Sequence, residues 1–333
     1  MTAPSYSKTA IVTGSAGFIG FHLARRLLQL GWKVIGVDEL NDYYDPTLKT
    51  ARNRQLLESP GYSFHQKDIA SPGVFGAVLS SDPEISTVFH FAAQAGVRMS
   101  IDQPAVYLRR NIDATFQVLD AIRHSNTARS KPRLVFASSS SVYGNSTRVP
   151  FREDDPADQP VSFYGATKRS CELLIRSYHA QFDLSATILR LFTVYGPWGR
   201  PDMAISLFTG KILADEAIEV FDSGRMTRDF TFVDDVIESI LRIQDAPHLP
   251  AYGIYNIGGS QPRPLADFIA AIEAACKTGK TAKIRNLPAQ TGDVRSTHAD
   301  STLTEKLTGF RPQTPLETGV TRFVEWYRSY HHV

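Results

Sequence analysis

Two groups of residues carry side chains suited to acid–base chemistry. Four consecutive serines begin at Ser138, soon after the apolar run Leu134-Val135-Phe136. Further along the chain, Tyr164 stands four positions before Lys168 in a stretch with a helical pattern. Residues four apart on a helix share one face, so the phenol and the ammonium project in the same direction. A free tyrosine has a pKa of about 10, and a neighbouring positive charge lowers that pKa toward neutrality.

The serine cluster gives this pair a chemical partner. An open parallel sheet presents the carboxyl ends of its strands to the ligand, and the serines follow the predicted strand Arg133–Ala137. Ser139 or a neighbour can therefore bridge Tyr164 and a substrate hydroxyl. The combination favours oxidation of a secondary alcohol by hydride transfer to NAD⁺, with Lys168 also bonded to the nicotinamide ribose. Two plainer interpretations are a chance Tyr-x-x-x-Lys spacing on a helix surface and a serine run that only forms a polar turn.

A glycine-rich turn near the N-terminus predicts where a nucleotide binds. Gly14, Gly17 and Gly20 follow the predicted strand Thr9–Val12 and open the predicted helix Phe18–Leu30. Glycines allow a tight turn and a close approach of the backbone to a pyrophosphate at the helix N-terminus. The spacing G-x-x-G-x-x-G departs from the standard dinucleotide fingerprint, so a plain strand-to-helix turn is the alternative.

A carboxylate follows the second predicted strand, Lys33–Val37, at Asp38. Such a group accepts hydrogen bonds from both ribose hydroxyls and repels a 2′-phosphate, which favours NAD over NADP. The alternative is that Asp38 only caps the loop Asn41–Asp45. Further predicted cofactor-binding residues are Ala16, Phe18, Ile19 and Asn41, then Asp68 and Ile69 at the adenine edge, and Phe91, Ala92, Ala93 and Gln94 beneath the cofactor.

Composition excludes several classes of protein. The 333 residues can bury a large core and favour two joined lobes, and a hydrophobic content of 42% with 21% charged residues is ordinary for a soluble globular protein. A net charge of +2 without a dense basic stripe argues against nucleic-acid binding, and no apolar run has the length of a membrane span or the form of a signal peptide. Two cysteines give neither a disulfide framework nor a metal-site spacing, so a reduced cytoplasmic setting is predicted.

Strand and helix patterns alternate through the first half of the chain. Predicted strands also cover Tyr62–Gln66, Thr87–Phe91 and Ala186–Leu191, and predicted helices cover Ala105–Arg123 and Phe163–Gln181. This alternation predicts an α/β fold, a Rossmann-type doubly wound parallel sheet with helices on both faces. The pattern loosens after about residue 195, although Ile254–Asn256 is predicted to rejoin the sheet. We therefore expect an NAD-binding domain of residues 1–195 plus about 229–257, interwoven with a smaller nucleotide-sugar-binding domain of residues 196–228 plus 258–333.

Four motifs together resemble the extended short-chain dehydrogenase/reductase family, over essentially the whole chain. They are Thr13-Gly14-x-x-Gly17-Phe18-Ile19-Gly20, Ser139-x-x-Val142-Tyr143-Gly144, Tyr164-x-x-x-Lys168 and Arg228-Asp229-Phe230. The resemblance implies a tightly bound NAD that is regenerated in each cycle, with Ser139, Tyr164 and Lys168 as the catalytic set. It further implies that Asn111 supports this set and that Arg228 holds the diphosphate of a nucleotide sugar. Family members commonly dimerise through the two helices that correspond to Ala105–Arg123 and Phe163–Gln181, so a homodimer is expected.

Ser140 and Ser141 separate the branches of this family. Nucleotide-sugar dehydratases have an acidic pair at these positions, and decarboxylases of UDP-glucuronate have a glutamate just before the Val-Tyr-Gly. The absence of a carboxylate here disfavours both reactions. Epimerisation at C4 needs no further acid or base, because the hydride that leaves C4 returns to the opposite face of a transient 4-keto sugar.

Three further stretches resemble the UDP-glucuronate 4-epimerase branch: Gln94–Arg98, Tyr195–Ala204 and Arg228–Phe232. Galactose-type epimerases have asparagine where Thr193 stands and arginine where Gln290 stands. The resemblance therefore implies conversion of UDP-glucuronate to UDP-galacturonate. The alternatives are a 4-epimerase of neutral UDP-hexoses, a UDP-glucuronate decarboxylase and a non-catalytic NAD-binding regulator, which would be expected to lose Tyr164 or Lys168.

Arg200 offers a chemical reason for a uronate substrate. A guanidinium binds a carboxylate in a two-point fork, so Arg200, with Ser141 and Thr193, is predicted to hold the C6 carboxylate; the alternative is a loop arginine that pairs with Asp202. Oxidation at C4 creates a β-keto acid, which loses CO₂ most easily when the C5–C6 bond is perpendicular to the carbonyl plane. The predicted substrate-binding residues are Arg98, Ser139, Ser140, Ser141, Thr193, Arg200, Met203, Arg228, Gln290 and Asp293.

Overall fold

The chain forms two units, each built from separate stretches of sequence. The computed structural model describes residues 6–125, 131–146, 148–289, 292 and 294–333. Unit 1 contains Met1–Val142, Ser162–Arg190 and Pro250–Tyr255, and unit 2 contains Tyr143–Val161, Leu191–Leu249 and Asn256–Val333.

Unit 1 is organised around a seven-stranded sheet with the order β11-β6-β5-β4-β1-β2-β3. The strands are β1 (Thr9–Thr13), β2 (Lys33–Asp38), β3 (Tyr62–Gln66), β4 (Ile85–His90), β5 (Arg133–Ser139), β6 (Ala186–Leu191) and β11 (Tyr252–Ile257). The pairings of β3 with β2, β2 with β1, β1 with β4 and β4 with β5 are all parallel. The predicted doubly wound sheet is therefore confirmed, and the strand predicted near Ile254 is β11 at its edge.

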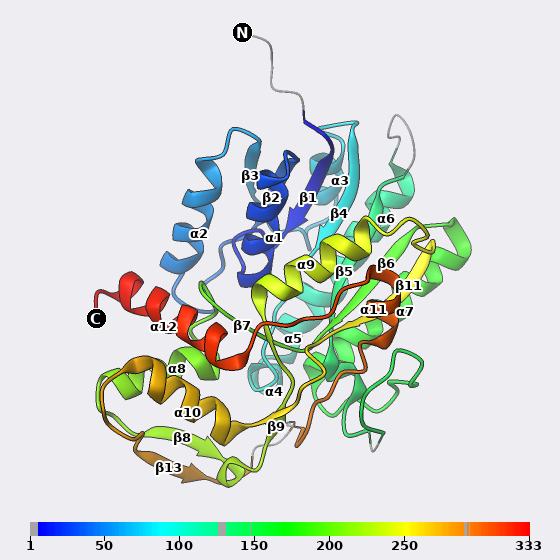
Figure 1. The fold of residues 1–333 in the computed structure, drawn as a ribbon. Coiled ribbons are helices and arrows are strands. Elements are labelled where there is room, and N and C mark those ends of the chain that lie inside the picture. The colour runs from blue at the N-terminus through cyan, green and yellow to red at the C-terminus, as the bar shows by residue number, and fades with distance from the viewer. Residues whose placement is uncertain (1–5, 126–130, 147, 290–291, 293) are drawn as a thin grey trace. The chain divides into compact units, whose positions relative to one another are not determined.

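Helices of two groups connect these strands (Figure 1). α1 (Phe18–Gln29) and α2 (Thr47–Leu57) pack together, whereas α6 (Ala114–His124) packs on both α3 (Val74–Leu79) and α7 (Phe163–Phe182). β2 and β3 lie on one side of β1 in the sheet, whereas β4, β5, β6 and β11 follow one another on its other side. Right-handed crossovers in opposite directions place the two helix groups on opposite faces, and the switch between β1 and β4 is where such sheets bind ligands.

An apolar core fixes the strands that lead into this switch point. Ile11 of β1, Val88 of β4 and Leu134 of β5 are completely buried, together with Val118 of α6 and Ile175 of α7. Burial of each such side chain contributes about 1.5–3 kcal/mol to folding. The core therefore holds β1, β4 and β5 together with α6 and α7.

Two helical segments differ from the sequence-based expectation. The predicted helix Ala105–Arg123 is helical, but it consists of α5 (Pro104–Tyr107), a π-helical segment η1 (Leu108–Asp113) and α6. Helix α2 was not predicted, because its buried side includes Lys49, Arg52 and Asn53 rather than an apolar stripe.

Unit 2 contains three two-stranded sheets and five α-helices of seven or more residues in its described part. β7 (Thr193–Tyr195) pairs with β10 (Phe230–Phe232), β8 (Ile218–Phe221) with β13 (Ile284–Leu287), and β9 (Thr227–Arg228) with β12 (Arg263–Pro264). The helices are α8 (Ala204–Leu213), α9 (Val233–Gln244), α10 (Leu265–Cys276), α11 (Thr302–Thr308) and α12 (Leu316–His331).

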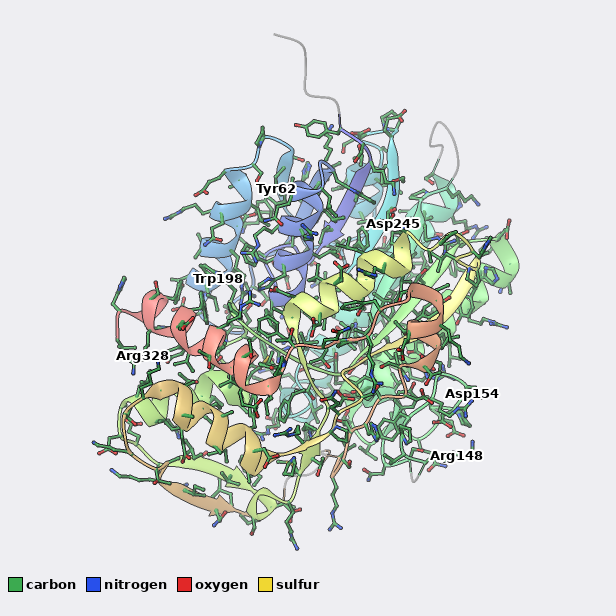
Figure 2. All side chains as sticks on the ribbon, viewed as in Figure 1. Tyr62, Arg148, Asp154, Trp198, Asp245 and Arg328 are labelled. Carbon is green, nitrogen blue, oxygen red and sulfur yellow. The ribbon has the colours of Figure 1, made fainter. Side chains whose placement is uncertain are left out.

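Aromatic side chains take the place of a regular sheet core in unit 2. Phe230 stacks on Phe268 with ring centroids 4.1 Å apart. Trp198, which is labelled in Figure 2, packs 5.4 Å from Trp326 and 5.3 Å from Tyr330, both on α12. Because Trp198 precedes Arg200 by two positions, these contacts anchor the loop that carries the predicted carboxylate-binding arginine.

Cys171 and Cys276 are both buried free thiols. Within the described ranges, no group of three or more histidine, cysteine, aspartate or glutamate side chains could hold a metal ion. None of the helices in that part of the chain is long and apolar enough to cross a membrane.

Candidate active site

The glycine-rich turn between β1 and α1 depends on close backbone contacts. Gly14 has a φ of +70°, and a Cβ on it would stand 2.7 Å from the amide nitrogen of Ala92. A Cβ on Gly20 would stand 2.1 Å from the carbonyl oxygen of Gly14, so neither position accommodates a larger residue. No side chain caps α1 at Gly17, and its first turn contains no acidic residue. The amides at this helix N-terminus therefore suit an anion such as a pyrophosphate.

Polar side chains of α2 and β3 contact the glycine-rich turn. The hydroxyl of Tyr62, labelled in Figure 2, lies 3.0 Å from both Ser15 Oγ and Asn53 Oδ1. The buried guanidinium of Arg52 donates from Nη1 to the carbonyl oxygen of Ala16 at 2.9 Å. The polar buried side of α2, which the sequence did not reveal, therefore fixes the backbone of Ala16 directly and is linked to the side chain of Ser15 through Tyr62.

Asp38 lies directly beside the glycine-rich turn. Its Oδ2 accepts from the amide of Ala16 at 3.1 Å, and its Oδ1 accepts from the amide of Leu40 at 2.9 Å. Burial raises the pKa of the Asp38 carboxyl, while these two amides and Lys49 act in the opposite direction. Lys49 in turn donates to the backbone and side-chain oxygens of Asn41, both at 2.6 Å. Asp38 thus joins the glycine-rich turn to the start of the loop that follows β2.

The remaining predicted cofactor residues follow β3 and β4 or begin α1. Asp68 accepts from the amide of Ala70 at 3.0 Å and pairs with Arg109, which the sequence did not single out. The other members are Phe18 and Ile19 in the first turn of α1, Ile69 after β3, and Phe91, Ala92, Ala93 and Gln94 after β4. Because β1, β2, β3 and β4 are parallel neighbours, the segments that follow them lie at one edge of the sheet.

Asn111 links the cofactor side of unit 1 to the helix that carries the predicted acid–base pair. It lies in the π-helical segment η1 and is almost completely buried. Its Oδ1 accepts from the amide of Gln94 at 2.7 Å, and its Nδ2 donates to the carbonyl of Gln94 at 3.1 Å and to Thr167 Oγ1 at 2.9 Å. A π-turn at this position is typical of functional sites in helices, and here it aims Asn111 at both Gln94 and α7.

Ser139 ends β5, and the next residues, Ser140–Tyr143, form a 3₁₀ turn. Ser139 Oγ donates to Ser141 Oγ and accepts from the amide of Ser141, both at 3.2 Å. A Cβ on Gly165 would stand 2.5 Å from the carbonyl oxygen of Ser141. The first turn of α7 therefore packs against the serine turn, and only glycine at 165 permits this approach.

Tyr164 stands in the first turn of α7. Ser162 caps this helix, accepting from the amide of Gly165 at 3.0 Å, which fixes the point at which the helix begins. The ring of Tyr164 is only partly buried and makes an edge-to-face contact with Tyr107, with centroids 6.2 Å apart. The phenol is thus held on a rigid helical turn.

Lys168 is buried one turn further along α7, with a residue exposure of 3%. Its ammonium lies 4.6 Å from the centroid of the Phe136 ring on β5. Burial lowers the pKa of Lys168 to about 8, with Cys171 and Glu172 acting in the opposite direction. A positive charge is therefore present near neutral pH on the helix face that it shares with Tyr164.

A buried ionic cluster lies one turn beyond Lys168 and was not anticipated. Glu172 accepts from Ser138 Oγ at 2.6 Å and from Arg169 Nη1 at 2.9 Å. Arg190 of β6 forks onto the same carboxylate, with Nε at 3.1 Å and Nη2 at 2.9 Å. The cluster ties the residue before Ser139 to α7 and β6. Its sequence signal was a glutamate four positions after Lys168, on the helix face that also carries Cys171 and Ile175.

In unit 2, Arg200 forms a two-point fork with Asp202, with both N–O distances at 2.9 Å. The carbonyl of Arg200 accepts from Ser206 Oγ at 2.8 Å, and Met203 immediately precedes α8. The pairing with Asp202 that the sequence left open is therefore present. A ligand carboxylate at Arg200 would take up the same kind of fork.

The motif at β9 and β10 is held by a buried carboxylate. Asp229 accepts from the amides of Gly259 at 2.8 Å, Ser260 at 3.0 Å and Ala299 at 2.9 Å. Its own carbonyl accepts from the amide of Thr193 at 3.2 Å. Asp229 thus joins segments that are distant in sequence, and burial raises its pKa despite the three amides.

Arg228 precedes this carboxylate, and its guanidinium donates to two backbone carbonyls and, from Nη2, to the sulfur of Met226 at 3.2 Å. Nη1 donates to the carbonyls of Thr227 at 3.1 Å and Arg295 at 3.2 Å. Arg98 stands at the start of the short helix α4 (Met99–Asp102) in unit 1 and is exposed.

The structure divides the predicted site residues between the units. The cofactor residues, Arg98, the serines 139–141, Tyr164 and Lys168 lie in unit 1, whereas Thr193, Arg200, Met203 and Arg228 lie in unit 2. Gln290 and Asp293 lie outside the described residues.

Comparisons with known proteins agree with this geometry. Residues 10–258 match the model of the NAD dependent epimerase/dehydratase family. The chain is 40% identical to UDP-glucuronate 4-epimerase 4 of Arabidopsis thaliana, over 99% of this chain and 77% of that protein. The UDP-glucuronic acid 4-epimerase of Bacillus cereus, solved with UDP-glucuronic acid and NAD, is 33% identical with a TM-score of 0.89, over 97% of this chain and 99% of that one. A UDP-glucose 4-epimerase of Thermotoga maritima, solved with UDP-glucose, is 27% identical with a TM-score of 0.85, over 97% and 99%.

Proposed function

Since the chain belongs to the NAD dependent epimerase/dehydratase family, we propose that it interconverts UDP-glucuronate and UDP-galacturonate by epimerisation at C4. The predicted family, the Rossmann-type sheet and NAD as the cofactor are confirmed. The observation that carries the choice of reaction is the serine turn at the end of β5, which packs on α7 at Gly165 without an acidic residue. In the family, the branches that dehydrate nucleotide sugars or decarboxylate UDP-glucuronate are expected to carry an acidic residue there.

In the proposed mechanism, Tyr164 removes the proton of the substrate 4-hydroxyl as a phenolate and later returns it. Ser139 shares this proton, and the buried ammonium of Lys168 stabilises the phenolate. Bound NAD⁺ supplies the acceptor for the C4 hydride, which returns to the opposite ring face. No net oxidation occurs, so the same residues serve both half-reactions.

The proposed division of labour keeps the boundaries expected from the sequence, which differ from those of the two units mainly at residues 143–161 and 229–249, both in unit 2. We assign NAD to residues 1–195 with about 229–257, and the nucleotide sugar to 196–228 with 258–333. Support comes from the uncapped amides of α1, the glycine turn and the adjacent Asp38, which lie in unit 1. Arg228 is assigned to the sugar-nucleotide diphosphate, with Gln290 and Asp293 as further substrate contacts.

Arg200 is proposed to hold the C6 carboxylate of the uronate and so to restrain loss of CO₂ from the 4-keto intermediate. The fork on Asp202 supports this role, because it demonstrates the geometry that a carboxylate adopts on this guanidinium. Arg200→Ala should raise KM for UDP-glucuronate about ten- to a hundredfold, since hydrogen bonds to a charged group contribute about 1.5–3 kcal/mol. The fraction of UDP-pentose among the products should also increase.

Arg152 provides the matched control for this variant. It pairs with Asp154 two positions away, as Arg200 pairs with Asp202, but both members of this pair are exposed. Arg152→Ala should leave KM and products unchanged. Wild-type kinetics and products from Arg200→Ala would refute the carboxylate role.

Parallel assays with UDP-galacturonate and UDP-galactose test the substrate class. A uronate 4-epimerase converts the first and leaves the second nearly untouched, whereas an epimerase of neutral UDP-hexoses reverses that preference. A protein that binds NAD and turns over neither sugar would be a non-catalytic regulator.

A homodimer and a cytoplasmic location complete the proposal. Leu108 of η1, Phe116 of α6 and Leu173 of α7 are 46%, 43% and 55% exposed, and α6 packs on both η1 and α7. These exposed apolar side chains support a dimer that pairs through the segments Ala105–Arg123 and Phe163–Gln181. Sedimentation of the wild type and of Leu173→Glu checks it, with a dimer expected for the first and a monomer for the second. The buried free thiols of Cys171 and Cys276 suit a reducing compartment.

A further inference from the structure

A continuous chain of hydrogen bonds runs through His90, at the end of β4. Its Nδ1 lies 2.8 Å from Thr13 Oγ1, and its Nε2 lies 3.1 Å from Thr115 Oγ1. Beyond these contacts, the amide of Ala92 donates to Thr13 Oγ1 at 3.1 Å, and Thr115 Oγ1 donates to the carbonyl of Asn111 at 2.6 Å. His90, Thr13 and Thr115 are each at most 1% exposed, so water does not compete for these groups.

Counting hydrogens fixes the direction of this chain. The carbonyl of Asn111 can only accept, so the single hydroxyl hydrogen of Thr115 points to it. His90 must therefore donate to Thr115 from Nε2. A neutral imidazole has one N–H, so Nδ1 is the acceptor and receives the hydroxyl hydrogen of Thr13. Thr13 Oγ1 then accepts from the amide of Ala92, and every donor and acceptor in the chain is paired.

A charged imidazole would break this arrangement. If Nδ1 also carried a hydrogen, Thr13 Oγ1 would accept two hydrogen bonds, one from Nδ1 and one from the amide of Ala92. The hydroxyl hydrogen of Thr13 would then be buried without an acceptor. Burial lowers the pKa of His90 to about 3, and the ammonium of Lys168 acts in the same direction. The ring of Phe136, 5.7 Å away between centroids, adds an apolar neighbour.

The two ends of the chain meet the loop that the proposed function places beneath the cofactor. At one end, Thr13 Oγ1 accepts from the amide of Ala92. This amide packs closely on Gly14, because a Cβ on Gly14 would stand only 2.7 Å from its nitrogen. At the other end, Asn111 bonds both the amide and the carbonyl of Gln94. The loop 91–94 is thereby fixed against the glycine-rich turn on one side and against η1 on the other.

We propose that His90 is a positioning residue for the cofactor site, locked as the neutral Nε2–H tautomer, which sets the spacing between the loop 91–94 and the glycine-rich turn. The inference rests on the proposed NAD site but not on which sugar is epimerised. A tautomer reversal or a charged ring would move the backbone at Ala92 or Gln94, and displacements of about 1 Å in such a site lower function by up to about a hundredfold.

Long-range ¹H–¹⁵N NMR of the histidine rings in the purified protein tests the tautomer directly. His90→Gln identifies the resonance by its disappearance. We expect one protonated ring nitrogen, Nε2, at every pH from about 5 to 8, the range in which an ordinary histidine titrates. A proton on Nδ1, or titration within that range, would overturn the proposal.

Variants of Thr115 test the positioning role. Thr115→Val removes the hydroxyl but keeps the shape, and should weaken NAD binding about tenfold or more by calorimetry, with a mixture of His90 tautomers. Thr115→Ser keeps the hydroxyl and should restore both readouts. Thr209→Val is the matched control, because the buried Thr209 hydroxyl has no hydrogen-bond partner in the described structure.

The outcomes separate this inference from the proposed reaction. NAD affinity in Thr115→Val equal to that in Thr209→Val, or a loss in Thr115→Ser as large as in Thr115→Val, would refute the positioning role. Neither result bears on the identity of the sugar product. An unexpected product would instead contradict the reaction and leave the tautomer standing.

Discussion

Units 1 and 2 each place a buried carboxylate beside a candidate site residue, but they satisfy it differently. In unit 1, Glu172 is bound by the guanidinium groups of Arg190 and Arg169 and by Ser138. In unit 2, Asp229 is bound by three backbone amides, those of Gly259, Ser260 and Ala299. One carboxylate joins side chains of regular elements, and the other joins loops.

This difference reflects how each unit positions its site. In unit 1, a parallel sheet already places Ser139 at a strand end, and the ionic cluster fastens that end to α7 and β6. In unit 2, the strands are short and the carboxylate itself gathers segments up to 70 positions apart. Neutralising Glu172 should therefore leave the buried guanidinium of Arg190 without a counter-charge. Neutralising Asp229 should loosen the loops whose amides it binds.

The largest expected effect concerns the acid–base chemistry of Tyr164 in unit 1. Tyr164→Phe should lower kcat by about 10²–10⁴, the usual contribution of a general acid–base group. Binding of UDP-sugar and the NAD content of the purified protein should stay at wild-type levels. Initial rates, calorimetry and release of NAD on denaturation measure the three quantities, and a wild-type kcat would remove the acid–base role.

Glu172→Gln should lower the free energy of unfolding by about 3–5 kcal/mol, because the buried Arg190 is left without its counter-charge. Urea denaturation measures this loss. Glu238→Gln is the control, since Glu238 forms an exposed pair with Arg242 on α9 and such pairs contribute about 0.3–0.5 kcal/mol. Equal losses in the two variants would mean that the ionic cluster does not fasten unit 1.

Lys168 gives unit 1 a distinctive dependence on pH. Its pKa of about 8 lies below its ordinary value of 10.5, so the unfolded state binds more protons between these values. The contribution of Lys168 to stability therefore rises with pH across that window, by at most about 3 kcal/mol. Lys168→Met should lack this rise in urea denaturation at pH 8 and pH 10. The same slope in both proteins would show that burial of the ammonium does not oppose folding.

Asp229→Asn should have the smallest effect, about 1–3 kcal/mol, because an asparagine at this site turns a donor toward at least one of the three amides. Unlike Glu172→Gln, it strands no buried guanidinium. Hydrogen exchange near Gly259 and Ala299 should increase, whereas exchange in β5 and α7 should not. An equal increase in hydrogen exchange in both units would show that Asp229 does not act on the loops of unit 2 alone.

The regular parts of unit 1 were predictable because their signals are local. The strand before Ser139, the helix carrying Tyr164 and Lys168, and the turn at Gly14 each follow from periodicity or from a motif within a few residues. Helix α2 was missed because its buried side is polar, and the π-turn at Asn111 has no sequence period of its own.

Polar contacts between residues far apart in the sequence could not be predicted from it. His90 meets Thr13 across 77 positions, and Asp229 meets Ala299 across 70. No spacing rule connects such residues, since only the assembled fold brings them together. Similarly, β13, which pairs with β8, was not predicted, because its residues are mostly exposed and carry little apolar alternation.

The most direct test of the central claim is to incubate the purified protein with UDP-glucuronate, without added cofactor, and to identify the product by NMR. UDP-galacturonate is the expected product, because the proposed reaction keeps NAD tightly bound and regenerates it, and no carboxyl group stands in the serine turn beside Ser139. A UDP-pentose as the main product, or no product despite bound NAD, would contradict it.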